Sequence, residues 1–318
     1  MTATVTDLDL MRLGEVIQAG SKSFATASNL FDAETRASAR LLYAWCRHCD
    51  DCIDGQDLGH GQAAPGTHDP RAELALLRAQ TADTLQGKPM SHPVFAALQM
   101  VVRKHAIPVA HPQALLDGFQ MDVEGRRYAT LEDTMSYCYH VAGVVGVMMA
   151  MVMGVRDDAT LDRASDLGLA FQLTNLARDV VDDARLGRVY LPGEWLETAG
   201  VAAEPRAIAD PRNRERVASV VARLLAEADR YYASSTVGFS QLPMRSAWAV
   251  ATAHMVYRKI GAEVLRKGPR AWDQRVSTSA VQKLTAVTRG AGSAIFAGTA
   301  AKFRAMPARD TLWTRPRV

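Results

Sequence analysis

Residues 172–183 read Gln-Leu-Thr-Asn-Leu-Ala-Arg-Asp-Val-Val-Asp-Asp, and this stretch indicates both the fold and the kind of site that the chain carries. On an α-helix, which turns by about 100° per residue, its polar residues fall within an arc of roughly 80°: Gln172, Asn175, Asp179 and Asp183. The other positions are mostly leucine, alanine and valine. The pattern predicts a helix that is buried over most of its circumference and carries one narrow polar stripe.

An earlier stretch has the same character. Residues 43–54 read Tyr-Ala-Trp-Cys-Arg-His-Cys-Asp-Asp-Cys-Ile-Asp. Its polar stripe spans roughly 60° of a helix and consists of Tyr43, Arg47, Asp50 and Asp54, with Asp51 at the edge. A single acidic stripe is most often a solvated helix face with salt bridges. Two stripes of one geometry, each on an apolar helix, favour a functional site instead.

The chemistry of the two stripes predicts a divalent metal. Buried carboxylates at four-residue spacing repel one another and are costly to remove from water unless cations compensate them. Oxygen ligands suit Mg²⁺ or Mn²⁺ rather than zinc, and Mg²⁺ usually completes its shell with water and substrate phosphates. Several groups near the stripes suit a phosphate-bearing substrate: Arg47, Arg178, Arg185, Arg188, Ser21, Lys22 and Ser23. The two stripes facing each other would form a metal-bridged diphosphate site.

Hydrophobic periodicity predicts an all-α fold. Apolar residues recur at spacings of three and four along almost the whole chain, and no long stretch alternates strictly. Thr130–Asp133 reads as a capping box at the start of a helix. Segments 55–70 and 187–211 are rich in glycine and proline and are predicted loops. Helices are expected near residues 7–20, 33–54, 70–86, 92–105, 112–123, 131–154, 160–184, 213–236, 242–267 and 279–303.

Domain organisation follows from the absence of a linker. We expect one domain over residues 1–306 and a poorly ordered tail over residues 307–318. The longest apolar run, Val141 to Val155, is shorter than the roughly 20 residues of a membrane-spanning helix and is predicted to be a buried helix. Gly143 and Gly146 within it permit close helix approach.

Composition excludes several classes of protein. The chain of 318 residues has 37 Lys and Arg against 34 Asp and Glu, a formal charge of +3, and 48% hydrophobic residues. These values are typical of a soluble globular protein and predict no nucleic-acid partner. Residues 1–10 lack the basic head and apolar core of a secretory signal, so a cytoplasmic location is expected.

Three of the four cysteines have the spacing C-x-x-C-x-x-C, at Cys46, Cys49 and Cys52. This spacing resembles part of an iron–sulfur motif, but the fourth cysteine with its following proline is missing. On a helix the three thiols spread over about a third of the circumference. We interpret them as small buried apolar residues.

Together these segments resemble one family. Five segments resemble those of the head-to-head isoprenyl diphosphate synthases and occur in the family's order along the chain: Gly20–Ala25, Tyr43–Asp54, Tyr137–Gly143, Phe171–Asp183 and Gly187–Pro192. These are the squalene and phytoene synthases, and the match is closest to the bacterial phytoene synthases. The resemblance covers nearly the whole chain. It implies a single-domain isoprenoid synthase fold, a helical bundle around a central cavity.

The resemblance also implies roles for individual residues. Mg²⁺ or Mn²⁺ would be held by Asp50, Asp54, Asn175, Asp179 and Asp183, of which the four aspartates are also candidate catalytic residues. The diphosphate or prenyl groups would contact Ser21, Lys22, Ser23, Phe24, Tyr43, Arg47, Gln172, Arg178, Arg188, Tyr190 and Tyr257. Some relatives carry histidine where this chain has Gly20, so one phosphate contact differs there.

Tyr137 is the candidate for steering the final loss of a proton, with the released diphosphate as acceptor. The alternative is a buried tyrosine bonded to backbone. The apolar segment after it would line a dry tunnel for prenyl chains, a role compatible with ordinary core packing: Val141, Ala142, Val144, Val145, Met148 and Met149. A dry wall protects a carbocation from water.

The implied reaction is condensation of two geranylgeranyl diphosphates through prephytoene diphosphate, a cyclopropyl compound, to phytoene, in carotenoid biosynthesis. It needs no NADPH. The alternatives are a dehydrosqualene or squalene synthase that uses farnesyl diphosphate, with NADPH for squalene, and a non-enzymatic helical assembly protein of the same fold. Because the product is apolar, we also expect transient peripheral contact with a membrane or hand-off to a downstream desaturase.

Overall fold

The computed structural model describes residues 22–56, 68–300, 307–309 and 311–317, and its regular elements within those ranges are all helices. The all-α prediction is confirmed. The main helices are α2 (Lys22–Ser28), α3 (Ala33–Asp54), α4 (Pro70–Leu85), α5 (Pro93–His105), α6 (Ala110–Val123), α7 (Leu131–Cys138), α8 (Val144–Val152), α9 (Asp158–Arg185), α10 (Gly193–Thr198), α11 (Pro205–Ala209), α12 (Arg214–Thr236), α13 (Met244–Lys267) and α14 (Ala280–Ala300). A π-turn, η1 (Tyr139–Gly143), joins α7 to α8, and 3₁₀ turns lie at η2 (Pro211–Asn213), η3 (Val237–Gln241) and η4 (Gly268–Arg270).

Most predicted helices begin and end within a few residues of the observed ones. One expectation was wrong, since the predicted loop 187–211 contains the short helices α10 and α11. Pro205 occupies the first turn of α11, where its fixed φ favours a helix start. The helix predicted over 131–154 is present as a continuous helical stretch, Leu131–Val152, with the π-helical segment η1 in its middle. The predicted helix at 7–20 lies outside the described residues.

Side-chain caps fix where the two stripe-bearing helices begin. Asp32 caps α3 by accepting from the backbone N–H of Thr35 at 2.9 Å, and Asp157 caps α9 by accepting from Thr160 at 2.8 Å. The predicted capping box is confirmed, since the Thr130 and Asp133 side chains bond reciprocally to each other's backbone at the start of α7. These caps set the register in which the stripes point inward.

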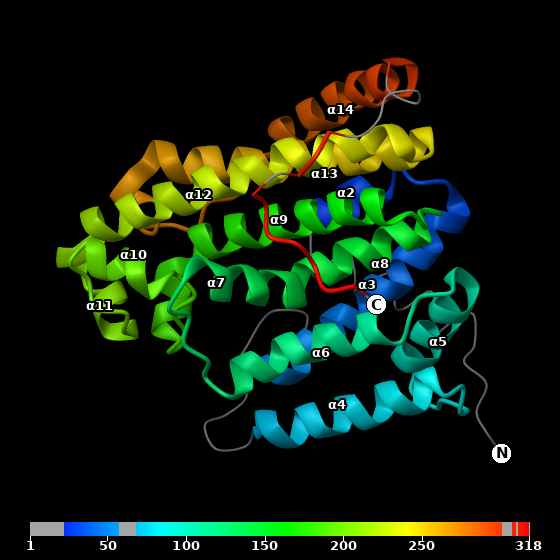
Figure 1. Ribbon diagram of the computed structural model, residues 1–318, viewed down its shortest axis with the longest axis horizontal. Helices are drawn as coiled ribbons and strands as arrows, with labels where there is room; N and C mark the ends of the chain where they lie inside the picture. Colours follow the sequence, from blue (N-terminus) through cyan, green and yellow to red (C-terminus); the bar gives the residue numbers. More distant parts are fainter. Residues whose placement is uncertain (1–21, 57–67, 301–306, 310, 318) are drawn as a thin grey trace.

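Helix α9 lies in the middle of the bundle, between α8 on one side and α12 and α13 on the other (Figure 1). Glycines allow the closest of these contacts. A Cβ added at Gly146 would lie 2.5 Å from the carbonyl oxygen of Ala164, and one at Gly168 would lie 2.4 Å from that of Ala142. The backbones of η1 and α8 therefore lie directly against α9, as the glycines of this segment predict.

One stretch, Leu131–Val152, is long and apolar enough to cross a membrane by length and composition. Within the fold, 61% of its most apolar window is buried, and Val144, Val147 and Met148 are fully inaccessible. The prediction of a buried apolar helix is confirmed for this segment. It forms part of the core next to α9.

The tail was expected to be poorly ordered, and its described residues 307–309 and 311–317 make specific contacts with α9. Arg315 is only 3% exposed and pairs with Asp162 of α9 at 2.8 Å. A segment with low hydrophobicity and high net charge gains little from burial, so its order depends on partners elsewhere in the fold. Here a row of carboxylates some 150 residues earlier supplies the partners.

Candidate active site

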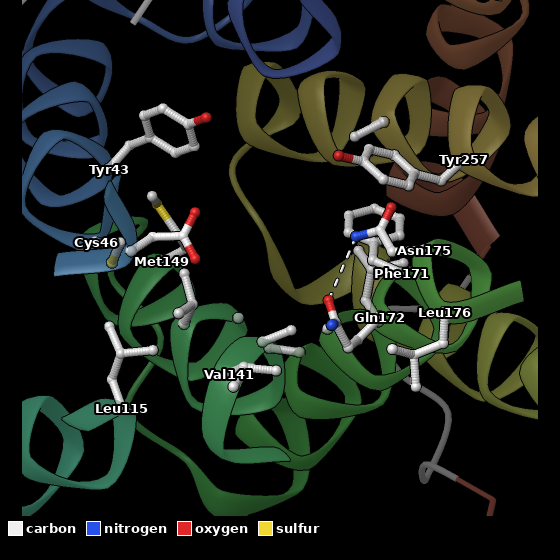
Figure 2. A pocket seen from close by; sticks show the side chains of 18 of the residues that line it. Tyr43, Cys46, Leu115, Val141, Met149, Phe171, Gln172, Asn175, Leu176 and Tyr257 are labelled. Atoms are coloured by element: carbon white, nitrogen blue, oxygen red, sulfur yellow. Dashed lines mark hydrogen bonds between the residues drawn. The ribbon is translucent and has the colours of Figure 1, made fainter. Parts of the chain in front are cut away.

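A cavity of about 950 Å³ lies between α3, α8, α9 and α13. Carboxylate and arginine side chains line one end, and aliphatic and aromatic side chains line the rest. Figure 2 shows Tyr43 and Cys46 of α3 on one wall, facing Phe171, Asn175 and Tyr257 from α9 and α13 across the open space. The fold thus brings the two predicted stripes to one cavity.

The cavity lining contains nearly all of the predicted site residues. They are Tyr43, Arg47, Asp50, Asp54, Tyr137, Gln172, Asn175, Arg178, Asp179, Asp183, Arg188, Tyr190 and Tyr257. Ser21 lies outside the described residues. Lys22, Ser23 and Phe24 belong to α2, but their side chains are outside the described part of the structure. Of the other basic candidates, Arg185 is largely exposed and pairs with Asp182 at 2.9 Å.

The stripe on α3 is short of positive charge. Arg47 serves two carboxylates, with Nη1 3.0 Å from Asp50 Oδ2 and Nε 3.1 Å from Asp51 Oδ1. Burial, followed by the charge of Asp54, raises the pKa of Asp50 to about 7. Asp54 pairs with Arg188 at 2.7 Å. Asp50 therefore ionises near neutral pH unless a further cation joins it.

The stripe on α9 contains two carboxylates whose pKa values are shifted in opposite directions. Burial raises the pKa of Asp179, but the hydrogen bonds and charges of Arg178 and Arg275 outweigh burial and hold it below 3.8. Arg275 reaches both carboxylate oxygens, at 2.9 and 2.8 Å. Burial and then the charge of Asp179 raise the pKa of Asp183 to about 8. No ion pair of Asp183 is found among the residues that the structure describes.

A divalent cation fits this arrangement. Oδ1 of Asn175 is buried and has no hydrogen-bond partner among the described residues, while its Nδ2 donates to Gln172 at 3.3 Å (Figure 2). Asp50 and Asp183, the two carboxylates of raised pKa, line the same cavity as this orphaned amide oxygen, and oxygen ligands of this kind suit Mg²⁺ or Mn²⁺. No group of three acidic, histidine or cysteine side chains among the described residues holds an ion by itself. Substrate phosphates or water would complete the shell.

Two residues of the site were missed from the sequence. Asp122 of α6 accepts hydrogen bonds from the Tyr137 hydroxyl at 3.0 Å and the Tyr190 hydroxyl at 2.7 Å. The signal was available, because Asp122 follows Leu115 and Phe119 at helical spacing on a face that lines the cavity. Arg275 gave no such signal, because it lies in the non-periodic segment between η4 and α14.

The Tyr137 hydroxyl donates to the carboxylate of Asp122, whereas the structural alternative expected a bond to backbone. Its ring stacks on Tyr190, with ring centroids 4.6 Å apart. Burial and the charge of Asp122 raise the pKa of Tyr137 well above its usual range, so the phenol stays neutral. The geometry provides a fixed, neutral hydroxyl at the polar end of the cavity.

The remaining walls are mostly apolar. Of the tunnel residues predicted after Tyr137, four line the cavity: Val141, Ala142, Val145 and Met149. Val144 and Met148 were also expected to line the cavity, but they belong to the hydrophobic core of the helical bundle and are fully inaccessible to solvent. The four cysteines are free and buried or half-buried, as the interpretation of the cysteine spacing predicts.

Comparison with known proteins connects this site to one family. The squalene/phytoene synthase family profile matches residues 17–282. The chain is 53% identical to a 15-cis-phytoene synthase from Pantoea ananas over 95% of this chain and 96% of that one, and 50% identical to one from a Paracoccus species over 95% and 96%.

A solved dehydrosqualene synthase matches with a TM-score of 0.79 and 28% identity over 90% of this chain and 96% of that chain. The isoprenoid synthase fold expected from the resemblance is confirmed. The region matched by the family profile and by these relatives includes the segments that contain both stripes. The chain belongs to the squalene/phytoene synthase family.

Proposed function

We propose that the chain is a phytoene synthase, which joins two molecules of geranylgeranyl diphosphate head to head and releases two diphosphates. The observation that carries this proposal is the pair of carboxylate stripes at one end of an apolar cavity. The identity of about half of all residues to curated phytoene synthases supports this substrate. The enzyme is accordingly a prenyltransferase.

Asp50, Asp54, Asn175, Asp179 and Asp183 would hold Mg²⁺ or Mn²⁺ in the loaded enzyme. Such ions supply positive charge that stabilises a departing diphosphate. The chain's own residues bind the same anion: Arg47, Arg178 and Arg188 line the polar end. Each of these arginines already pairs with a stripe carboxylate. Arriving phosphates and ions would share these partners.

The apolar walls hold the prenyl chains and exclude water while carbocations exist. The double bond of one chain attacks the allylic cation formed from the other, and loss of a proton from the resulting cation closes the cyclopropane ring of prephytoene diphosphate. A second ionisation, rearrangement and proton loss give phytoene. Tyr137, fixed by Asp122, would orient the group that loses this proton, with the released diphosphate as acceptor.

Two other functions remain as outcomes of the test. A dehydrosqualene or squalene synthase would use farnesyl diphosphate, and squalene formation would require NADPH. Sequence identity favours phytoene as the product, because the chain is 53% identical to a phytoene synthase and 28% identical to a dehydrosqualene synthase. A non-enzymatic assembly protein would have no use for carboxylates of raised pKa at a cavity wall.

The test is to incubate the purified protein and Mg²⁺ with labelled C15 or C20 diphosphate, with and without NADPH, and to identify the hydrocarbon. We expect phytoene from the C20 substrate without reductant. A C30 product alone would contradict the proposal. A thermal melt with Mg²⁺ and inorganic diphosphate tests the assembly protein, which would show no joint stabilisation.

We further propose that the enzyme works in the cytoplasm and delivers its apolar product by transient contact with a membrane or with a downstream desaturase. The insolubility of a C40 hydrocarbon in water supports delivery to an apolar acceptor. Sedimentation with phosphatidylglycerol vesicles, before and after turnover, tests the membrane route. Equal sedimentation with and without vesicles would contradict it.

A further inference from the structure

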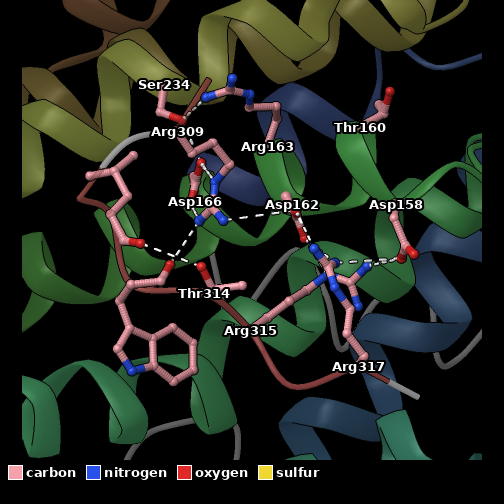
Figure 3. Close-up of polar contacts among 12 residues, drawn as sticks. Asp158, Thr160, Asp162, Arg163, Asp166, Ser234, Arg309, Thr314, Arg315 and Arg317 are labelled. Atoms are coloured by element: carbon pink, nitrogen blue, oxygen red, sulfur yellow. Dashed lines mark hydrogen bonds and ion pairs between the residues drawn. The ribbon is translucent and has the colours of Figure 1, made fainter. Parts of the chain in front are cut away.

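The described residues 307–309 and 311–317, which we name the C-terminal strap, run along the first half of α9 (Figure 3). Three carboxylates at four-residue spacing face them: Asp158, Asp162 and Asp166. Arg315 Nε lies 2.8 Å from Asp162, and Arg317 Nη1 lies 2.6 Å from the same carboxylate. Arg315 also pairs with Asp158. The strap is thus fastened by charge along about two turns of the helix.

Apolar and backbone contacts hold the strap as well. The backbone N–H of Trp313 donates to the Tyr231 hydroxyl at 3.0 Å, and the Trp313 ring lies 5.4 Å from that of Tyr139. Arg230 of α12 donates to the Thr311 hydroxyl at 2.7 Å. The strap therefore bridges α12 and η1 across α9.

The deepest contact of the strap leads to the cavity. Asp166 is fully buried and accepts from Arg309 Nη2 at 2.5 Å and from Arg309 Nε at 3.0 Å. Ser234 also donates to Asp166 and in turn accepts from Arg163 Nη1 at 2.5 Å. A second nitrogen of Arg163 donates to the carbonyl of Pro307.

Arg163 separates the strap from the cavity. It is 4% exposed and lines the cavity, whereas the strap residues and the three carboxylates do not. Arg163 precedes Asp179 by 16 residues, which places it about 24 Å along α9 from the polar end at 1.5 Å per residue. This distance is comparable to an extended C20 prenyl chain. Arg163 is therefore at the far, apolar end of the cavity.

We propose that the C-terminal strap holds Arg163 as the end wall of the cavity and thereby limits the length of prenyl chain that the enzyme accepts. The inference rests on the proposed function. An arginine beside an apolar ligand is stable only if its guanidinium is bonded away from the ligand. Ser234 and the Pro307 carbonyl bond it in that direction, and Arg309 holds the buried Asp166 beneath them.

Gly238 supports the same wall from the opposite side. It lines the cavity next to Arg163, and a Cβ added there would lie 2.9 Å from the Cβ of Arg163. Substitutions at Arg163 and Gly238 should therefore change the length of the cavity in opposite directions. Arg163→Ala lengthens the cavity, and Gly238→Ala shortens it.

The experiment measures kcat/KM for C15, C20 and C25 prenyl diphosphates in the full chain. In Arg163→Ala we expect the C25 to C20 ratio to rise on the order of tenfold or more, since one added apolar unit shifts selectivity by about this factor. In Gly238→Ala we expect the C20 to C15 ratio to fall by a similar factor. Thermal melts establish that each variant is folded.

Arg309→Met tests the strap itself, because it removes the charge that holds Asp166. We expect its C25 to C20 ratio to rise as well, and the double variant with Arg163→Ala to show no further rise, since both changes act through one side chain. Arg317→Ala is the matched control. It removes a half-exposed strap arginine that does not touch Arg163, so the ratios should stay as in the wild type.

Folded Arg163→Ala and Gly238→Ala enzymes with wild-type ratios would overturn the end wall. Should Arg163→Ala not fold, the ratio in Gly238→Ala decides the matter alone. A changed ratio in Arg163→Ala with an unchanged ratio in Arg309→Met would overturn the role of the strap. Failure of the proposed function is distinguishable, because it requires a wild-type enzyme that does not turn over the C20 substrate.

Discussion

Replacing Asp183 by asparagine is expected to stabilise the metal-free chain at alkaline pH while it abolishes catalysis. Burial and the neighbouring charge of Asp179 raise the pKa of Asp183 from 3.8 to about 8. Between these values the folded chain retains a proton that the unfolded chain releases. The free energy of unfolding therefore falls as pH rises through this window, and the loss is complete above pH 8.

The size of the effect follows from the same pKa. A tenfold change in proton affinity corresponds to about 1.4 kcal/mol, which bounds the loss at about 6 kcal/mol for this residue. Asp183 is half-buried at the cavity wall and has Arg188 nearby, so water and this arginine soften the repulsion when the carboxyl ionises. We expect Asp183→Asn to gain about 2 kcal/mol at pH 9, at an effective dielectric constant of about 20.

The assay is urea unfolding in EDTA at pH 5 and pH 9. At pH 5 the gain of Asp183→Asn should be much smaller than at pH 9, because only the first part of the window between the unfolded pKa of 3.8 and the folded pKa of about 8 has been crossed. Asp179→Asn is the matched control, four residues earlier on the same helix. Its loss leaves Arg178 and Arg275 without their carboxylate and should cost about 2 kcal/mol.

Both variants should lose activity, although their stabilities move in opposite directions. Mg²⁺ with inorganic diphosphate should raise the melting temperature of the wild type more than that of either variant. A loss of stability in Asp183→Asn at pH 9, or an equal gain at pH 5, would refute the reasoning. In that case the repulsion between the two carboxylates would not be stored in the metal-free fold.

Further predictions concern the site and the core. Arg275→Gln should lower kcat/KM by about a hundredfold, because Asp179 loses a bidentate partner, and steady-state kinetics with Arg275→Lys as a partial rescue checks this. Gly168→Ala should destabilise the chain by about 2 kcal/mol in urea, because its Cβ would meet the Ala142 carbonyl at 2.4 Å; a neutral result would contradict the close helix contact. Trp45→Ala, at a fully buried position, should cost about 4 kcal/mol in the same assay.

The two stripes could be predicted because their information is local. Helical spacing alone places Asp50 with Asp54 and Asn175 with Asp179, and the apolar residues between them state which face is buried. The fold only had to turn the two faces toward each other. The same rule fails for Arg275, which reaches Asp179 from a non-periodic segment 96 residues later.

The tail shows a second limit of local patterns. Its arginines and prolines are typical of a disordered end when they are considered alone. The partners of Arg309 and Arg315 lie more than 140 residues earlier, on α9. Local sequence patterns do not indicate such partners, because the pairing joins two segments that are far apart along the chain.

Helix α9 thus carries two rows of carboxylates with the same four-residue spacing and opposite uses. In the first half, arginines of the same chain compensate Asp162 and Asp166, and the row fastens the strap. In the second half, compensation stops at Asp179, and Asp183 keeps a raised pKa. Arginine side chains of the same chain stay with their carboxylates permanently. A carboxylate without such a partner can instead bind a metal ion that arrives with the substrate. On α9, the first row is thus matched by arginines of the strap, and the second row ends at Asp183, whose pKa stays raised at the cavity wall.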